Sequence, residues 1–140
     1  MKLEINLNEQ SDIQSKIEKY FSEKDDIDTV LLFGSFANGT FTSYSDIDIA
    51  IHSFYKLDYD KLSKIQTDLA LLCKREIDLV DLKKAEGIFL YQIMTTGKKI
   101  KIDNTIFVNH LVKALCFRED FLPIIKRSQE EKIRRFINGE

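Results

Sequence analysis

Cysteine and proline are scarce in this sequence, tryptophan is absent, and charge of one sign does not dominate. The 140 residues include two cysteines, Cys73 and Cys116, which lie far apart and outside any CxxC or Cys/His grouping. This spacing argues against a disulfide framework and against a zinc site, so we expect two buried, reduced thiols. No stretch approaches the roughly 20 apolar residues of a membrane span, and the polar start lacks the apolar segment of a signal peptide. We therefore expect a cytoplasmic protein.

The balance of charges limits the partners that the protein can attract. With 21 basic and 23 acidic residues, the formal net charge is -2, which gives no overall attraction to nucleic acid or to an anionic membrane. We expect neither of them as a partner. Hydrophobic residues make up 44% and charged residues 31% of the chain, as in globular proteins, and the length suits a single domain over 1–140.

Hydrophobic periodicity predicts alternating helices and strands in the first half of the chain. The motif at 11–14 resembles a capping box, so a first amphipathic helix is expected from Ser11 to about Lys24. A second is expected to begin near Asp58, with its buried face formed by Leu62, Ile65, Leu69 and Leu72. Short β-branched and aliphatic runs predict strands at 29–33, 47–51 and 76–82.

The second half of the chain is predicted to be mostly helical. A helix from about Lys84 to Thr96, ended by Gly97, is followed by a short strand or extended segment at 99–102 and by a helical tail from about Asn104. The only proline, Pro123, is expected to kink or divide this tail. Apolar residues recur in the tail at near-helical spacing, which indicates a face packed on the protein's own core, with a partner helix as the alternative. They are Phe107, Leu111, Ala114, Leu115, Phe121, Leu122 and Ile125.

A phosphate-binding turn is predicted where the first strand ends. Gly34 lets the backbone approach a ligand, and a short helix beginning at Ser35 would direct free N–H groups at an anion, with the Ser35 hydroxyl as a further donor. The segment 34–40 contains no lysine, which argues against a P-loop NTPase. The charge of a bound phosphate must then be neutralised by other groups.

Asp46 and Asp48 can supply this neutralisation indirectly, by binding a metal cation. Side chains two apart in a strand project to the same side, so both carboxylates would face one site while the isoleucines at 47, 49 and 51 face a core. Carboxylate oxygens bind Mg²⁺, and two Mg²⁺ ions can clamp the attacking and leaving oxygens of a phosphoryl displacement. A third acid completes such a site, and Asp78 is our choice because it lies mid-strand opposite two apolar neighbours. Glu76 and Asp81 are reserves.

The combination of Gly34-Ser35 with Asp46-Ile47-Asp48 ten residues later resembles the signature of the DNA polymerase beta-like nucleotidyltransferase superfamily, and the chain length resembles its minimal nucleotidyltransferases. The resemblance covers about residues 30–52. It implies an α+β fold, in which a small mixed β-sheet is backed by helices and followed here by a C-terminal helical tail. It also implies that Asp46 and Asp48 bind both metal ions, and that Asp78 helps to bind the catalytic ion and to activate the incoming hydroxyl. Gly34 and Ser35, to which we add Ser45, would hold the nucleotide.

The segments 76–82, 97–102 and 118–125 more loosely resemble the MntA-type antitoxins that pair with HEPN-domain RNase toxins. Members of that group transfer AMP from ATP to a tyrosine of the toxin. The resemblance therefore implies an enzyme with ATP as nucleotide and a HEPN-domain toxin as partner. Family members commonly have an arginine after Gly-Ser, where this chain has Phe36 and Asn38.

That departure leaves a second hypothesis open, in which the protein is a binding module that neutralises a toxin by occupancy alone. Transfer to a small molecule such as an aminoglycoside is disfavoured, because the chain is short for a pair of domains that could enclose such a substrate. Three further residues stay outside the predicted site: His52 and His110 are interpreted as surface or satisfied core residues, and Tyr44 as an ordinary loop aromatic.

Overall fold

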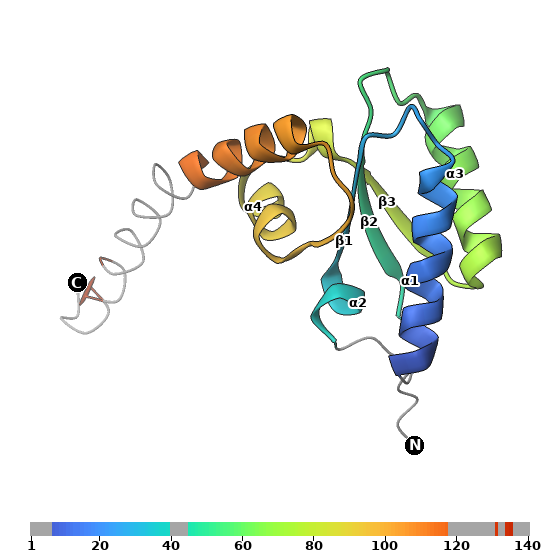
Figure 1. Cartoon of the computed structure of the whole chain (residues 1–140). Coiled ribbons are helices and arrows are strands. Elements are labelled where there is room, and N and C mark those ends of the chain that lie inside the picture. The colour runs from blue at the N-terminus through green and yellow to red at the C-terminus, as the bar shows by residue number, and fades with distance from the viewer. Residues whose placement is uncertain (1–6, 40–44, 118–130, 132–133, 136–140) are drawn as a thin grey trace.

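A four-stranded mixed β-sheet forms the centre of the molecule (Figure 1). The structure is a computed structural model, and it describes residues 7–39, 45–117, 131 and 134–135. The strand order is β3-β2-β1-β4; β1 pairs antiparallel with β2 and β4, and β3 pairs parallel with β2. This arrangement confirms the expected α+β fold with a small mixed sheet. The strands are β1 (Thr29–Phe33), β2 (Ile47–His52), β3 (Ile77–Asp81) and β4 (Lys98–Lys101).

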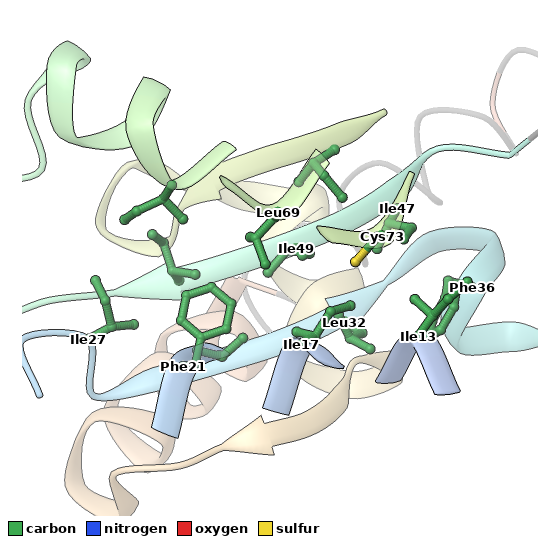
Figure 2. Close-up of a cluster of buried hydrophobic side chains, with 14 of the residues drawn as sticks. Ile13, Ile17, Phe21, Ile27, Leu32, Phe36, Ile47, Ile49, Leu69 and Cys73 are labelled. Carbon is green, nitrogen blue, oxygen red and sulfur yellow. The ribbon is translucent and has the colours of Figure 1, made fainter. Parts of the chain in front are cut away.

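Two amphipathic helices, α1 (Leu7–Ser22) and α3 (Tyr59–Cys73), cover one face of the sheet (Figure 1). Each helix presents residues four apart, which therefore lie on one side. Figure 2 shows these side chains meeting the apolar residues of β1 and β2. Every strand residue in this cluster except Ile77 is fully buried, so the face is sealed. The helical members are Ile13, Ile17, Phe21, Ile65, Leu69 and Cys73.

The opposite face of the sheet is covered only in part. There α4 (Gly87–Thr96) and a helix over 104–117 pack on a second apolar cluster, which includes Leu31, Ala50 and Leu82 (Figure 1). This cluster lies toward the carboxyl end of β2, because Leu31 is paired with Ala50. Asp48 lies nearer the amino end of β2, where its partner on β1 is the partly buried Phe33. The helix predicted from about Lys84 begins three residues later, at Gly87, because Leu82–Lys84 form a 3-10 turn, η1.

Two expectations about the covered face are wrong in detail. The first helix begins at Leu7, four residues before the predicted start, so Ser11 lies inside α1 and does not cap it. In α3 the buried stripe runs Ile65, Leu69, Cys73, because the spacing of four carries it past Leu72, which is 38% exposed. The predicted start of α3 is confirmed, since the Asp58 side chain accepts a hydrogen bond of 2.8 Å from the backbone N–H of Lys61.

The helix over 104–117 is the described part of the predicted tail. Asp103 begins it, with its carboxylate accepting a hydrogen bond of 3.1 Å from the backbone N–H of Ile106. The prediction of self-packing is confirmed for three residues that contact the second cluster, namely Phe107, Leu111 and Ala114. Leu115 is 38% exposed, and Val108 and Val112 are also exposed. The other predicted tail residues, Phe121, Leu122, Pro123 and Ile125, lie outside the described residues.

The two cysteines and the membrane prediction can also be compared with the structure. Both thiols are free, as expected, but only Cys73 is buried and Cys116 is exposed, so the expectation of two buried thiols is wrong for Cys116. Across residues 7–39 and 45–117 and the few that follow, no helix combines the length and the apolar character that crossing a membrane requires.

Candidate active site

Gly34 forms a turn that only glycine fits, at the junction of β1 and the five-residue helix α2 (Gly34–Asn38). Its φ of 71° lies in the left-handed region, where side chains are strained. A Cβ on Gly34 would also collide with the carboxylate of Asp48. Gly34 therefore lies against an acid of the candidate site, and its predicted close approach to a ligand stays a prediction.

The carboxylates of Asp48 and Asp78 stand side by side on neighbouring strands. In the parallel pair β2 and β3, Asp48 is in register with Asp78, and in the antiparallel pair β1 and β2, Phe33 is opposite Asp48. Ile47, Ile49 and Ile51 are fully buried on the other face of β2. The predicted alternation is thus confirmed for Asp48 and the isoleucines, but not for Asp46, which lies outside the strand. Asp46 precedes β2 and is exposed.

The crowding of these acids changes the chemistry of Asp48. Burial, followed by the negative charges of Asp78 and Asp46, raises the pKa of Asp48 to about 6. Such a carboxylate favours a proton or a cation, and hard oxygen donors of this kind suit Mg²⁺. Within the part of the chain that the structure describes, no three Asp, Glu, His or Cys side chains gather as a ready-made metal site. The donor set that fits a divalent cation is therefore the pair Asp48 and Asp78, with Asp46 nearby.

A cavity of about 640 Å³ opens over Asp48 and Asp78, a volume in the range of ligand pockets. Gly34 and Ala37 of the turn form one part of its wall, and a side of α4 forms another. Phe33 and Phe89 meet edge to face in this wall, with ring centroids 5.7 Å apart. The described lining residues include no lysine or arginine. They are Phe33, Gly34, Ala37, Asp48, Asp78, Val80, Phe89, Gln92 and Thr96.

A second cavity, of about 460 Å³, lies between α3 and the start of β3 and shares Asp78 with the first. Asp46 lines it together with Glu76, and its α3 side includes Leu71, which is 74% exposed. Gln66 also lines it, but the Gln66 amide donates a hydrogen bond of 2.7 Å to the carbonyl of Ile77. The three predicted acids therefore lie between two cavities of different chemistry.

The other predicted residues lie at varying distances from this arrangement. Ser35 and Ser45 are partly buried, and neither is among the residues that line the two cavities. Of the reserve acids, Glu76 lines the second cavity, whereas Asp81 is buried and accepts a hydrogen bond of 3.0 Å from the backbone N–H of Lys83. Asp81 thus caps the 3-10 turn, which makes Asp78 the better third acid.

Phe36, at a position where an arginine is common in the family, is fully buried in the first apolar cluster (Figure 2). It therefore contributes to the core. Asn38 is the last residue of α2. Tyr44 lies outside the described residues.

The two histidines do not line either of the two cavities that contain Asp46, Asp48 and Asp78. His52 is 5% exposed, and its Nδ1 lies 2.9 Å from Asp28 Oδ1, near the opposite end of β2. His110 Nδ1 lies 2.9 Å from the carbonyl oxygen of Ile106 on its own helix. Both interpretations as satisfied residues are confirmed.

Sequence reasoning missed the side of α4 that faces the first cavity. Phe89, Gln92 and Thr96 follow at intervals of three and four, so they share one side of the helix. This spacing was available in the sequence, where it reads like any amphipathic stripe. What the sequence lacked was the packing of α4 beside the carboxylates.

Relatives of known structure share this architecture. A chain from the crystal structure of a toxin–antitoxin with AMP-PNP superposes with a TM-score of 0.70 at 26% identity, covering 86% of this chain and 98% of that chain. A chain from a complex of the tri-AMPylated Shewanella oneidensis HEPN toxin with an MNT antitoxin superposes with a TM-score of 0.65 at 25% identity, covering 89% and 98%.

Comparison of the amino-acid sequence also finds nucleotidyltransferases. The chain is 37% identical over 71 residues to the protein adenylyltransferase MntA of Shewanella oneidensis, which is 51% of this chain and 51% of MntA, so the match spans about half the length of that relative. It is 34% identical over 74 residues to MJ0128 of Methanocaldococcus jannaschii, covering 53% of this chain and 76% of that protein. The family model described as polymerase beta, nucleotidyltransferase matches residues 15–106, which contain Gly34 and all three acids. The chain therefore belongs to the polymerase beta nucleotidyltransferase family.

Proposed function

We propose that this protein is a Mg²⁺-dependent adenylyltransferase of the cytoplasm that moves AMP from ATP to a tyrosine of a HEPN-domain toxin and so acts as an antitoxin. The observation that carries the proposal is the joint position of Asp48, Asp78 and the Gly34 turn around one cavity. A triphosphate and the acids would repel each other, and the described lining residues supply no cation. A pair of divalent ions would remove that repulsion.

Asp46, Asp48 and Asp78 would hold the ions, and Gly34, Ser35 and Ser45 would contact the nucleotide. When bound, such ions neutralise the triphosphate and stabilise charge on the attacking and leaving oxygens. In the reaction, the tyrosine oxygen bonds to the α-phosphorus, and the bond from that phosphorus to the oxygen bridging the β-phosphate breaks. Pyrophosphate leaves, and the phenol proton passes to Asp78 and then to solvent.

The choice of a toxin tyrosine as acceptor rests on the relatives. MntA of Shewanella oneidensis is named a protein adenylyltransferase, and one similar solved complex pairs an MNT antitoxin with a tri-AMPylated HEPN toxin. Asp46 and Asp78 are both exposed and line the second cavity beside the exposed Leu71 of α3, a position that suits an acceptor presented by another protein.

The test is transfer of label from ATP labelled at the α-phosphate to a HEPN-domain protein encoded beside this chain. Asp46→Asn and Asp48→Asn should each lower the rate at least about 100-fold while the protein stays folded. Asp60→Asn, the same change at the exposed start of α3, serves as the matched control and should leave the rate unchanged. Undiminished labelling in both site variants would show that these acids do not carry the reaction.

Neutralisation by occupancy is the second candidate function. It is favoured by Val108, Val112 and Leu115, which follow at intervals of four and three on the helix over 104–117 and are 52%, 52% and 38% exposed. A toxicity rescue assay separates the two functions, because occupancy survives Asp48→Asn and catalysis does not. Rescue by that variant at wild-type level favours occupancy, whereas loss of rescue favours transfer.

A further inference from the structure

The side of α4 that faces the first cavity carries groups that nucleotide transfer itself does not require. The phosphates need the Gly34 turn and the acids, yet the cavity extends from them to Phe89, Gln92 and Thr96. A nucleoside triphosphate held by its phosphates must direct its base into the space that remains. The wall of that space is therefore the part of the protein that can distinguish one base from another.

Phe89 offers a surface on which a base can stack. It is 43% exposed and is fixed by its edge-to-face contact with Phe33. Stacking of a base on an aromatic ring contributes about 1–3 kcal/mol and tolerates any base. Phe89 would thus strengthen binding of a nucleotide without selecting it.

Gln92 offers the selectivity. Among the polar side chains of this wall, Thr96 already donates its hydroxyl to the carbonyl of Gln92, at 2.6 Å. Within the described residues, the Gln92 side-chain amide has no hydrogen-bond partner and is exposed. It contrasts with Gln66 of the second cavity, whose amide is held by Ile77. Gln92 is therefore available to a ligand.

A carboxamide presents one donor and one acceptor side by side. Adenine matches this pair on both of its edges, since the N6 amino group lies between the acceptors N1 and N7. Guanine matches it on one edge only, because its other edge, O6 with N7, carries two acceptors. Adenine therefore has more ways to satisfy the amide than guanine has.

We propose that Phe89 and Gln92 on α4 form a base-binding subsite in which Phe89 stacks on the base and Gln92 favours adenine over guanine. The proposal deepens the function proposed above and rests on it, because it assumes that the phosphates occupy the Gly34 side of the cavity. It makes α4 the element that determines why ATP is the nucleotide donor.

Binding measurements test the subsite without any transfer reaction. Calorimetry with Mg²⁺ compares three probes: AMP-PNP, GMP-PNP and inorganic tripolyphosphate, which has no base. The wild type should bind AMP-PNP at least about fivefold more tightly than GMP-PNP, the lower limit expected of a paired amide. Gln92→Leu should remove that preference and leave tripolyphosphate binding unchanged. Phe89→Leu, which keeps the apolar contact with Phe33, should weaken both nucleotides about fivefold or more and also leave tripolyphosphate unchanged.

Two neighbours provide matched controls. Ile88, 47% exposed beside Phe89, and Thr95, which like Thr96 donates to a carbonyl four residues earlier, both lie off the cavity wall. Ile88→Ala and Thr95→Val should change none of the three affinities. A Gln92→Leu variant that keeps the preference for AMP-PNP would overturn the proposal.

The subsite and the proposed transfer fail in distinguishable ways. If Phe89→Leu leaves nucleotide binding intact but slows labelling of the protein acceptor, the wall belongs to the acceptor, and the base-binding proposal is wrong while transfer stands. If the base preference depends on Gln92 but no acceptor is labelled, the subsite is supported and the proposed transfer is wrong.

Discussion

The two faces of the sheet differ sharply although they alternate along the same strands. On the face under α1 and α3, Ile47, Ile49 and Ile51 are fully buried in an apolar cluster. On the other face, Asp48 and Asp78 stand open to a cavity beyond the point where the second cluster ends. The difference indicates that the sealed face supplies most of the stability, whereas the open face carries the acids of the proposed reaction. Changes on the two faces should therefore have separable effects.

The largest effect is expected inside the sealed face. Leu69→Ala should lower the free energy of unfolding by about 2–5 kcal/mol, because Leu69 is fully buried in the first cluster. Leu71→Ala, two residues away on α3 but 74% exposed, should change it by less than about 0.5 kcal/mol. Denaturant unfolding of the two variants measures the contrast, and similar losses from both would show that the face is not sealed.

The next effect is expected where the sealed strand β1 turns into the open face. Gly34→Ala and Gly39→Ala both place a side chain at positive φ, 71° and 83° respectively, at a cost of about 1–2 kcal/mol. A Cβ at Gly39 meets nothing within 4 Å, whereas one at Gly34 collides with Asp48. Gly34→Ala should therefore displace the Asp48 carboxylate and abolish nucleotide binding in the presence of Mg²⁺, whereas Gly39→Ala should retain that binding. Retained binding in Gly34→Ala would contradict the close approach of Gly34 and Asp48.

The smallest effect is a gain in stability on the open face. The pKa of Asp48 is raised from 3.8 to about 6 in the folded protein, so the folded state prefers the protonated acid. Stability linked to Asp48 is then present below about pH 4 and lost as the pH rises toward 6. Asp48→Asn should stabilise the metal-free protein above pH 6 by on the order of 1 kcal/mol, a value reduced for partial solvent exposure.

Thermal unfolding in a chelator, at pH 4 and pH 7.5, measures this gain. Adding Mg²⁺ provides the control, because a bound ion should stabilise the wild type more than the variant. A variant that is less stable than the wild type at pH 7.5 without metal would show that the acids on the open face do not repel one another.

One sequence pattern predicted both which strand residues are buried and which acids face the site. Period-two alternation in 47–51 and 76–82 assigns each side chain to a face, and three strands and the start of α3 lie where the pattern indicates. The register of Asp48 with Asp78 could not be predicted, because it depends on the pairing of strands far apart in the chain. Cys116 was misread for a related cause, since its exposure is decided by packing between elements.

The contribution of α4 shows the same limit. Its stripe of Phe89, Gln92 and Thr96 has the spacing of a helix side, but only the fold brings that side to the acids. The start of α1 at Leu7 was missed because a local capping pattern at Ser11 competed with a longer helix. Local sequence patterns thus predicted the helices and strands, whereas the residues that line the cavity depend on how these elements pack together.

The register of Asp48 and Asp78 has a consequence for how the site can evolve. Paired strands lie about 4.8 Å apart, a distance maintained by backbone hydrogen bonds that no side chain can alter. The spacing between the two acids is therefore inherited from the sheet and stays constant when the surrounding residues change. Cavity walls such as α4 can change to suit another base or acceptor without changing the distance between the backbone positions of the two acids.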